Sequence, residues 1–188
     1  MIFLFAAALA AAQPAPCPDV VTAEAFICRA VRATADSEPE VAAENFEQAA
    51  AALDPSDPQI ARLWAAAGNM WIAAGQPGKA AVALDKALAG SGLEAEQRGE
   101  ALLDRARAAE AQDDLKTARA KANEAAQTIS DDPFLWFFSA ALAIREDDAA
   151  TAKSSIGRAL TLAPNDPMIL FEAGHVAHFA GDEAGARD

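Results

Sequence analysis

The side chains of this chain that could take part in chemistry are two cysteines, two histidines and several acidic pairs. Cys17 and Cys28 are its only cysteines. An even cysteine number in an exported chain favours a disulfide, which would tie the extended segment around Cys17 to the first helix. The alternative is two free thiols, one exposed and one packed as a small hydrophobic side chain.

The two histidines, His175 and His178, are three residues apart and would share one face of a helix. Two imidazoles at that spacing could hold a metal ion if an acidic side chain faced them. No third ligand stands near them, and contact with a partner explains both histidines as well. We therefore expect no metal site and no cofactor.

Three acidic doublets could suggest a calcium site or a pair of catalytic carboxylates. They are Asp113-Asp114, Asp131-Asp132 and Asp147-Asp148. Each falls where a helix is expected to end or begin, and aspartate is favoured there as a cap or turn residue. The sequence also has no phosphate-binding glycine loop, no zinc-type cysteine spacing and no nucleophile elbow. It predicts no catalytic residue, and so a protein that is not an enzyme.

The elements that position these residues recur along the chain. Three Asp-Pro pairs predict helix starts, with an aspartate as cap and a proline at the first helical position: Asp57-Pro58, Asp132-Pro133 and Asp166-Pro167. The last two are 34 residues apart (166 minus 132). Helix stops are expected at positions 75, 113, 147 and 181, in steps of 38, 34 and 34 residues. A fixed period of this length indicates a repeat architecture.

The apolar residues between these markers have helical spacing. Trp64, Ala67, Gly68 and Trp71 lie at i, i+3, i+4 and i+7, and a second helix follows with Ala80, Leu84 and Ala87. This copy resembles the tetratricopeptide repeat of about 34 residues. The resemblance implies an all-α fold, a right-handed superhelical solenoid of antiparallel helical hairpins with a concave groove. Small residues at Gly68 and Ala80 would let paired helices approach closely.

The resemblance covers residues 20–188 and divides them into five copies. We expect a degenerate first repeat at 20–55, repeats at 58–89, 94–130 and 133–164, and an incomplete fifth at 167–188. The first helix is expected from about Val20 to Ala35, and Ser37 with Glu40 to form a capping box for the second. The incomplete last repeat predicts an uncovered apolar face and self-association through it.

The N-terminus has the composition of a secretory signal. Residues 1–12 are uncharged and apolar and end in small residues, so we expect a cleaved signal peptide, with an uncleaved apolar tail as the alternative. Residues 13–19 would be extended. The mature protein would then be periplasmic or secreted. No later segment is long and apolar enough to span a membrane.

The overall composition and charge limit the classes of molecule that the protein could bind. Hydrophobic residues make up 53% and charged residues 23%, which predicts a folded chain. The net charge of -13 would repel a phosphate backbone, so we expect no nucleic acid. The remaining function is a non-catalytic scaffold that binds a protein or peptide. The alternatives are a self-associating structural module and an accessory subunit of an envelope enzyme or assembly complex.

In this family the first helix of each repeat faces the groove. The resemblance therefore implies these partner-binding residues: Arg62, Asn69, Leu103, Arg107, Phe134, Phe137, Phe138, Phe171, His175 and Phe179. Phe134 and Phe138 have core packing as an equal alternative, because phenylalanines at helical spacing are usually core residues. Phe137 and Phe171 occupy equivalent positions one 34-residue step apart (171 minus 137), and we expect them to share one apolar floor.

Overall fold

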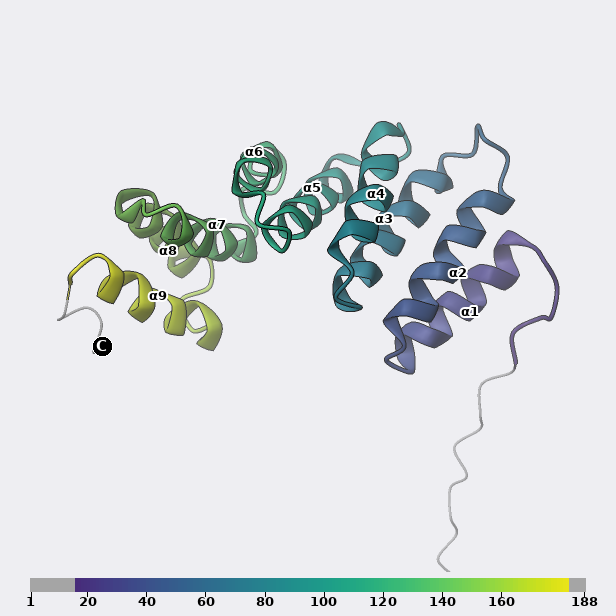
Figure 1. Cartoon of the computed structure of the whole chain (residues 1–188), viewed down its shortest axis with the longest axis horizontal. Coiled ribbons are helices and arrows are strands. Elements are labelled where there is room, and N and C mark those ends of the chain that lie inside the picture. Colours follow the sequence, from purple (N-terminus) through teal and green to yellow (C-terminus); the bar gives the residue numbers. More distant parts are fainter. Residues whose placement is uncertain (1–15, 183–188) are drawn as a thin grey trace, which may run out of the picture.

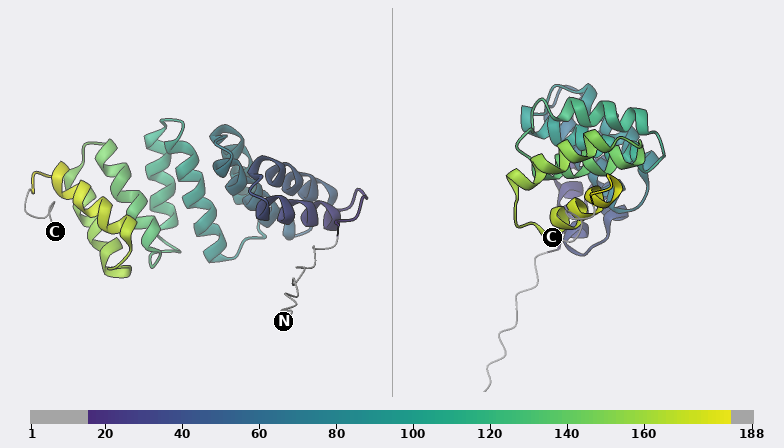
Figure 2. Two further views of the ribbon diagram at one scale, coloured as in Figure 1. Left: turned by 90° about the horizontal axis from the view of Figure 1, so that it is seen from below. Right: turned by 90° about the vertical axis from the view of Figure 1, so that its left-hand side faces the viewer.

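The computed structural model of the chain describes residues 16–182, which form nine helices and no strand. Consecutive helices pair as hairpins, and the hairpins lie side by side in an elongated row (Figures 1 and 2). The helices are α1 (Ala23–Ala35), α2 (Pro39–Ala52), α3 (Gln59–Ala73), α4 (Pro77–Ala89), α5 (Ala95–Glu110), α6 (Leu115–Ala125), α7 (Pro133–Arg145), α8 (Ala149–Leu162) and α9 (Pro167–Phe179). The all-α solenoid expected from the sequence is confirmed.

All three Asp-Pro pairs lie at helix starts, and the predicted positions of cap and proline hold for α7 and α9, whereas at α3 Pro58 is itself the cap residue. Asp132 and Asp166 cap α7 and α9, and each carboxylate accepts a hydrogen bond of 2.8 Å from the backbone N–H two residues on. Asp57 does the same for Gln59 at the start of α3, again at 2.8 Å. The N–H groups of a first helical turn have no partner within the helix, so these carboxylates satisfy donors that would otherwise need water.

Two of the acidic doublets lie in the tight turns inside the hairpins, and the third, Asp131-Asp132, lies between α6 and α7, where one hairpin follows another. Asp113 and Asp147 adopt a left-handed backbone conformation, with φ of 62° and 58°, and Asp114 and Asp148 then cap α6 and α8. The pKa values of the Asp114 and Asp148 carboxyls are lowered, first by the side-chain hydrogen bond from Thr117 or Thr151 and then by the backbone N–H of the same threonine. The prediction that aspartates serve as caps and turns is confirmed.

The predicted capping box at Ser37 and Glu40 is wrong. Ser37 instead takes the left-handed turn position, with φ of 60°, and α2 begins at Pro39 with no side-chain cap. The proline explains the difference, because its fixed φ suits the first helical position and its missing N–H needs no cap there. The first helix also starts later than expected, at Ala23, where Thr22 provides the cap.

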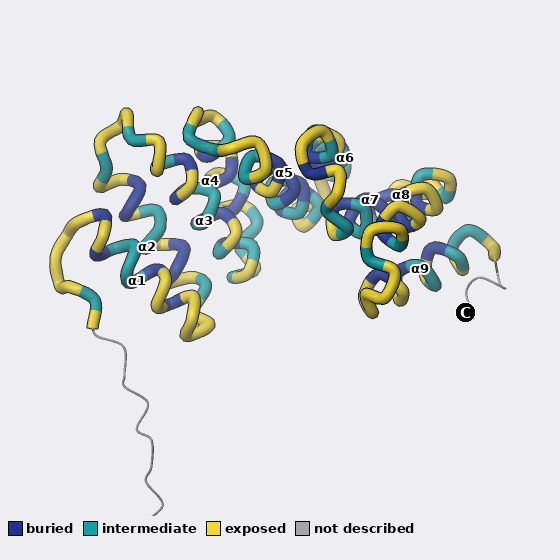
Figure 3. The backbone as a smooth tube through the Cα atoms, turned by 180° about the vertical axis from the view of Figure 1, so that it is seen from behind, coloured by how far each residue is buried: buried dark blue, intermediate teal, exposed yellow. Residues whose placement is uncertain are grey.

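Small residues set the distance between paired helices. A Cβ atom on Gly68 would lie 2.4 Å from Cγ of Leu84, so α3 and α4 could not pack as they do with a larger residue at position 68. Ala80, Ala118 and Ala152 occupy the equivalent place in the second helix of three hairpins and are fully buried. The buried residues follow the lines along which neighbouring helices meet (Figure 3).

Polar contacts fasten the third hairpin to the fourth. Arg145 of α7 forms ion pairs with Glu110 and, at 2.6 Å, with Asp113. Arg119 of α6 forms another with Glu146, just after α7. These contacts lie beside an apolar cluster of α5, α6 and α7 side chains, so this junction combines buried area with ion pairs.

The N-terminal segment is fixed to the first helix. Cys17 and Cys28 form a disulfide, and Arg29 donates hydrogen bonds to the backbone carbonyls of Pro18, at 2.9 Å, and Val20, at 3.3 Å. Residues 1–12, the expected signal peptide, and residues 183–188 of the last repeat lie outside the described residues. Within residues 16–182, no helix is both long enough and apolar enough to cross a membrane.

Candidate partner-binding groove

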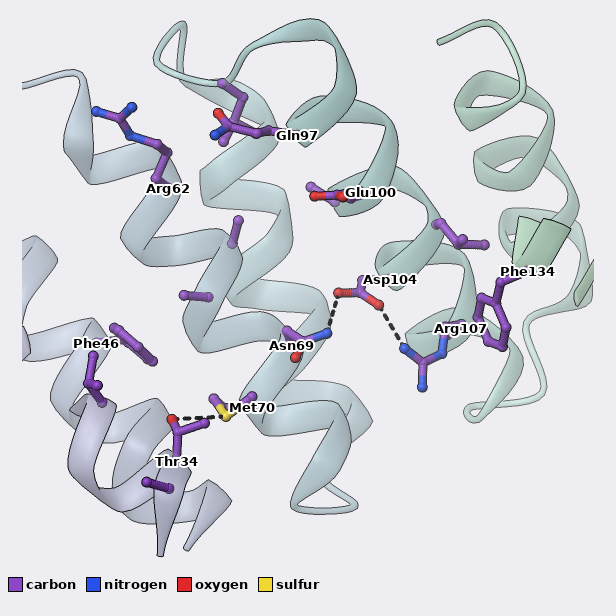
Figure 4. Close-up of a pocket in the computed structure, with 17 residues that line it drawn as sticks. Thr34, Phe46, Arg62, Asn69, Met70, Gln97, Glu100, Asp104, Arg107 and Phe134 are labelled. Carbon is purple, nitrogen blue, oxygen red and sulfur yellow. Dashed lines mark hydrogen bonds and ion pairs between the residues drawn. The ribbon is translucent and has the colours of Figure 1, made fainter. Parts of the chain in front are cut away.

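A cavity of about 730 Å³ opens along the first helices of the hairpins (Figure 4). We call it the groove. Most of its lining side chains come from α1, α3 and α5, and Phe134 of α7 closes one end. The lining residues are Val31, Thr34, Ala35, Phe46, Arg62, Ala65, Ala66, Asn69, Met70, Leu93, Gln97, Glu100, Ala101, Leu103, Asp104, Arg107 and Phe134.

The groove contains part of the residue set expected from the sequence. Arg62, Asn69, Leu103, Arg107 and Phe134 all line it. Leu103 is nearly fully buried and forms part of the floor, whereas Phe134 is more than one-third exposed. Helical spacing thus identified groove-lining side chains on α3, and the same spacing one repeat later identified those on α5.

The sequence analysis did not predict that the first hairpin contributes side chains to the groove. Val31, Thr34 and Ala35 are groove residues of α1 and lie at i, i+3 and i+4. That spacing was visible in the sequence, but the first repeat is degenerate and none of its positions was assigned to the groove. Leu93 was missed for a different reason, since it lies in the loop before α5, where helical periodicity gives no information.

A chain of polar contacts crosses the groove from α3 to α7. The Asn69 side-chain amide donates a 2.8 Å hydrogen bond to Oδ2 of Asp104, and Nη1 of Arg107 lies 2.8 Å from the other oxygen of that carboxylate. The Arg107 guanidinium in turn lies 5.5 Å from the centre of the Phe134 ring. Both Asp104 oxygens are therefore engaged, and Arg107 keeps further donors facing the groove.

Two charged side chains of the groove have no partner within residues 16–182. Arg62, in the first turn of α3, and Glu100, on α5, are both exposed and form neither a side-chain hydrogen bond nor an ion pair. Figure 4 shows Arg62 on α3 at the side of the view opposite Phe134, and Glu100 on α5 between the two. The groove therefore carries a free positive and a free negative charge on different helices.

The remaining predicted residues lie elsewhere. Phe138 is a correction: it is 92% buried within the α5–α6–α7 core and does not line the groove. Phe137 is half-buried against the α7–α9 core and stacks on Phe134, with 5.6 Å between ring centroids. Successive helical positions are about 100° apart, so one of the two adjacent phenylalanines turns into the core.

The C-terminal set lies on α9 and does not line the groove. Phe171 is 79% exposed and Phe179 is half-buried. Nδ1 of His175 lies 3.6 Å from Oε2 of Glu172, a largely buried carboxylate. Among the described residues, no three histidine, cysteine or acidic side chains are grouped so that they could hold a metal ion.

The comparisons with known proteins concern the fold. No family model matches the sequence, and no curated protein matches it either. Among solved structures, the MamA protein superposes with a TM-score of 0.72 at 13% identity, covering 88% of this chain and 86% of that one. YrrB, a TPR protein with an unusual peptide-binding site, gives 0.65 at 18% identity over 87% and 80%. PilF of Pseudomonas aeruginosa gives 0.72 at 19% identity over 90% and 73%.

Proposed function

Because this chain has the tetratricopeptide-repeat fold, we propose that it is a non-catalytic scaffold that binds a segment of a partner protein in its groove. The observation that carries the proposal is the groove itself, an apolar channel built by side chains from consecutive hairpins. Apolar area that stays open to water in the free protein is a source of binding free energy when a partner covers it.

We place this function in the cell envelope or outside the cell. The disulfide between Cys17 and Cys28 supports an oxidising compartment, because such bonds are rare in the cytosol. The apolar run at residues 1–12 supports export. Fractionation of cells that make the full chain tests this, and recovery of all the protein with reduced thiols in the cytosol would contradict it.

Two matched substitutions test the groove. Val31 lies in the groove and is 57% exposed, whereas Val82 lies on α4 outside the groove and is 58% exposed. A glutamate at either position adds the same charge to a similarly exposed site, so neither should unfold the protein. We expect Val31→Glu to abolish capture of the partner from an envelope extract and Val82→Glu to leave it intact. Equal capture by both variants would contradict binding in the groove.

Self-association is a second candidate, favoured by the exposed side chains of α9. Met168, Leu170 and Phe171 are 60%, 49% and 79% exposed, and large apolar side chains so close together often mark an interface. We expect the mass measured by sedimentation to rise with protein concentration and Phe171→Glu to prevent the rise. A constant monomer mass over the same concentrations would exclude this candidate.

A further inference from the structure

Resting on the proposed function, we infer that the partner segment is an amphipathic α-helix. Its bulky apolar side chains face the groove, an acidic side chain lies beside Arg62 and a basic one beside Glu100. Three properties of the groove lead to this occupant: its hydrogen-bonding capacity, its shape and its charges.

The floor of the groove offers almost nothing to an extended backbone. It is lined by alanine and other apolar side chains, among them Ala65, Ala66, Ala101 and Leu103. An extended segment buried there would leave many of its N–H and C=O groups without partners, which is costly away from water. A helix satisfies its own backbone and needs only an apolar surface.

The polar side chains that do line the groove cannot replace a strand partner. Both carboxylate oxygens of Asp104 are already bound, to Asn69 and to Arg107. The main chain of α3 and α5 is bonded within each helix, so neither helix presents a strand edge. The available donors and acceptors are therefore isolated side-chain groups, which suit individual side chains of a bound helix.

The shape of the groove also favours large side chains on the partner. Alanines form a shallow, open floor, and the 730 Å³ above it has room for several leucine- or phenylalanine-sized groups. The groove runs from α1 to α7, on the order of 30 Å if neighbouring helices are about 8–10 Å apart. A helix of about 18 residues has that length.

The free charges then select a partner and orient it. Asp104 and Arg107 neutralise one another, whereas Arg62 and Glu100 do not have partners within residues 16–182. A helix with a carboxylate toward α3 and a cation toward α5 would neutralise both. Ion pairs at an interface rim add little affinity, but they disfavour the reversed arrangement.

Two synthetic peptides, each mixed with the full-length protein, test the inference. Both have 18 residues, blocked ends and the same composition of leucine, alanine, glutamine, glutamate and lysine. In one the leucines lie at i, i+3, i+4 and i+7, and in the other they alternate. We expect the helical-pattern peptide to bind at least about tenfold more tightly, measured by fluorescence anisotropy. We also expect Val31→Glu to weaken its binding and Val82→Glu not to.

A charge exchange tests the orientation. We expect Arg62→Glu to weaken binding of the helical-pattern peptide about threefold to tenfold, and replacement of the peptide glutamates by lysine to restore it. Ala66→Leu, which fills the floor, gives a second block should Val31→Glu lower the helix content measured by circular dichroism.

Other outcomes overturn the inference. Tighter, groove-dependent binding of the alternating peptide would show an extended occupant and would leave the proposed function standing. Binding of neither peptide, or helical-peptide binding that both block variants leave unchanged, would also refute the helix. A different result would refute the proposed function: capture of the same envelope proteins by Val31→Glu and Val82→Glu.

Discussion

The missing side chain of Gly68 allows α3 and α4 to pack closely, because Leu84 occupies the space where a Cβ atom would lie. Gly157 of α8 has the opposite surroundings, because no atom beyond the local backbone of α8 lies within 4 Å of the position that its Cβ would take. The same substitution at the two glycines should therefore change stability in opposite directions.

We expect Gly68→Ala to lower the free energy of unfolding by about 1–3 kcal/mol, because the added methyl group forces the helices apart. Gly157→Ala should raise it by about 0.5–1 kcal/mol, because alanine restricts the unfolded chain and suits a helix interior. Urea denaturation measures both. A stabilising Gly68→Ala would show that the close approach of α3 and α4 is not required.

Acid should weaken two of the helix caps. The carboxyls of Asp114 and Asp148 have pKa values below their ordinary value in the folded protein, so the unfolded chain takes up protons first as the pH falls. Their contribution to stability is complete above about pH 5 and is lost as the pH falls through the lowered values.

At pH values below about 4, we expect the melting temperature of the protein to decrease. The melting temperature of the double variant Asp114→Asn/Asp148→Asn should decrease less steeply over the same pH range. Asparagine is also a good N-cap, so the double variant should remain folded at pH 7. Identical pH profiles for both proteins would show that these caps do not contribute to the acid dependence.

The residue scale also shows what the sequence could predict. The caps at Asp132 and Asp166 and the small residues at Gly68 and Ala80 depend on contacts within one hairpin, and local spacing identified them. Local spacing left two alternatives open for Phe138, the groove and the core, and it placed Phe137 in the groove. Which of two adjacent phenylalanines enters the core depends on the angle at which the next helix packs, and one chain's periodicity does not fix that angle.

One large side chain, Trp71, contacts both of the first two hairpins. Trp71 of α3 is almost completely buried, and its indole Nε1–H donates a 2.8 Å hydrogen bond to Oε1 of Glu47 on α2. The ammonium of Lys79 on α4 lies 4.0 Å from the centre of its ring. Trp71 thus connects α2, α3 and α4, which belong to two consecutive hairpins.

We expect Trp71→Ala to lower the free energy of unfolding by about 3–5 kcal/mol, since it leaves a large cavity between two hairpins. Trp136 is a suitable control, because it is only half-buried and one ring face is covered by Arg158, 3.6 Å from its centre. Trp136→Ala should cost less in the same thermal melts. A larger loss for Trp136→Ala would contradict this assignment.

At the element scale, the order and type of the helices followed from the 34-residue period, whereas the first repeat was poorly predicted. Its first helix begins at Ala23 and contributes Val31, Thr34 and Ala35 to the groove. Its few large apolar residues match the repeat pattern weakly. Its orientation is instead set by packing against α2, which packs in turn against α3, and this information is not local.

At the scale of the whole molecule, each hairpin packs chiefly on its neighbours, which makes the array almost one-dimensional. The exposed apolar side chains are unevenly distributed along it. Phe134 stands at one end of the groove, and Met168, Leu170 and Phe171 lie on α9. The two proposed interfaces are thus separate in the fold, and substitutions at one should leave the other intact.

The groove is lined by side chains from α1, α3, α5 and α7. A bound partner would therefore contact all four hairpins at once, whereas in the free protein each hairpin is stabilised only by its neighbours. In the free protein such hairpins can open one at a time. We expect an occupied groove to make them open together, so that amide hydrogen exchange slows to a common rate from α1 to α7. Exchange in α9, which contributes nothing to the groove, should keep its own rate. Binding of a partner would thus make the unfolding of separate hairpins cooperative. A protease that cleaves opened hairpins would then cut the free protein faster than the partner-bound protein, without contacting the partner.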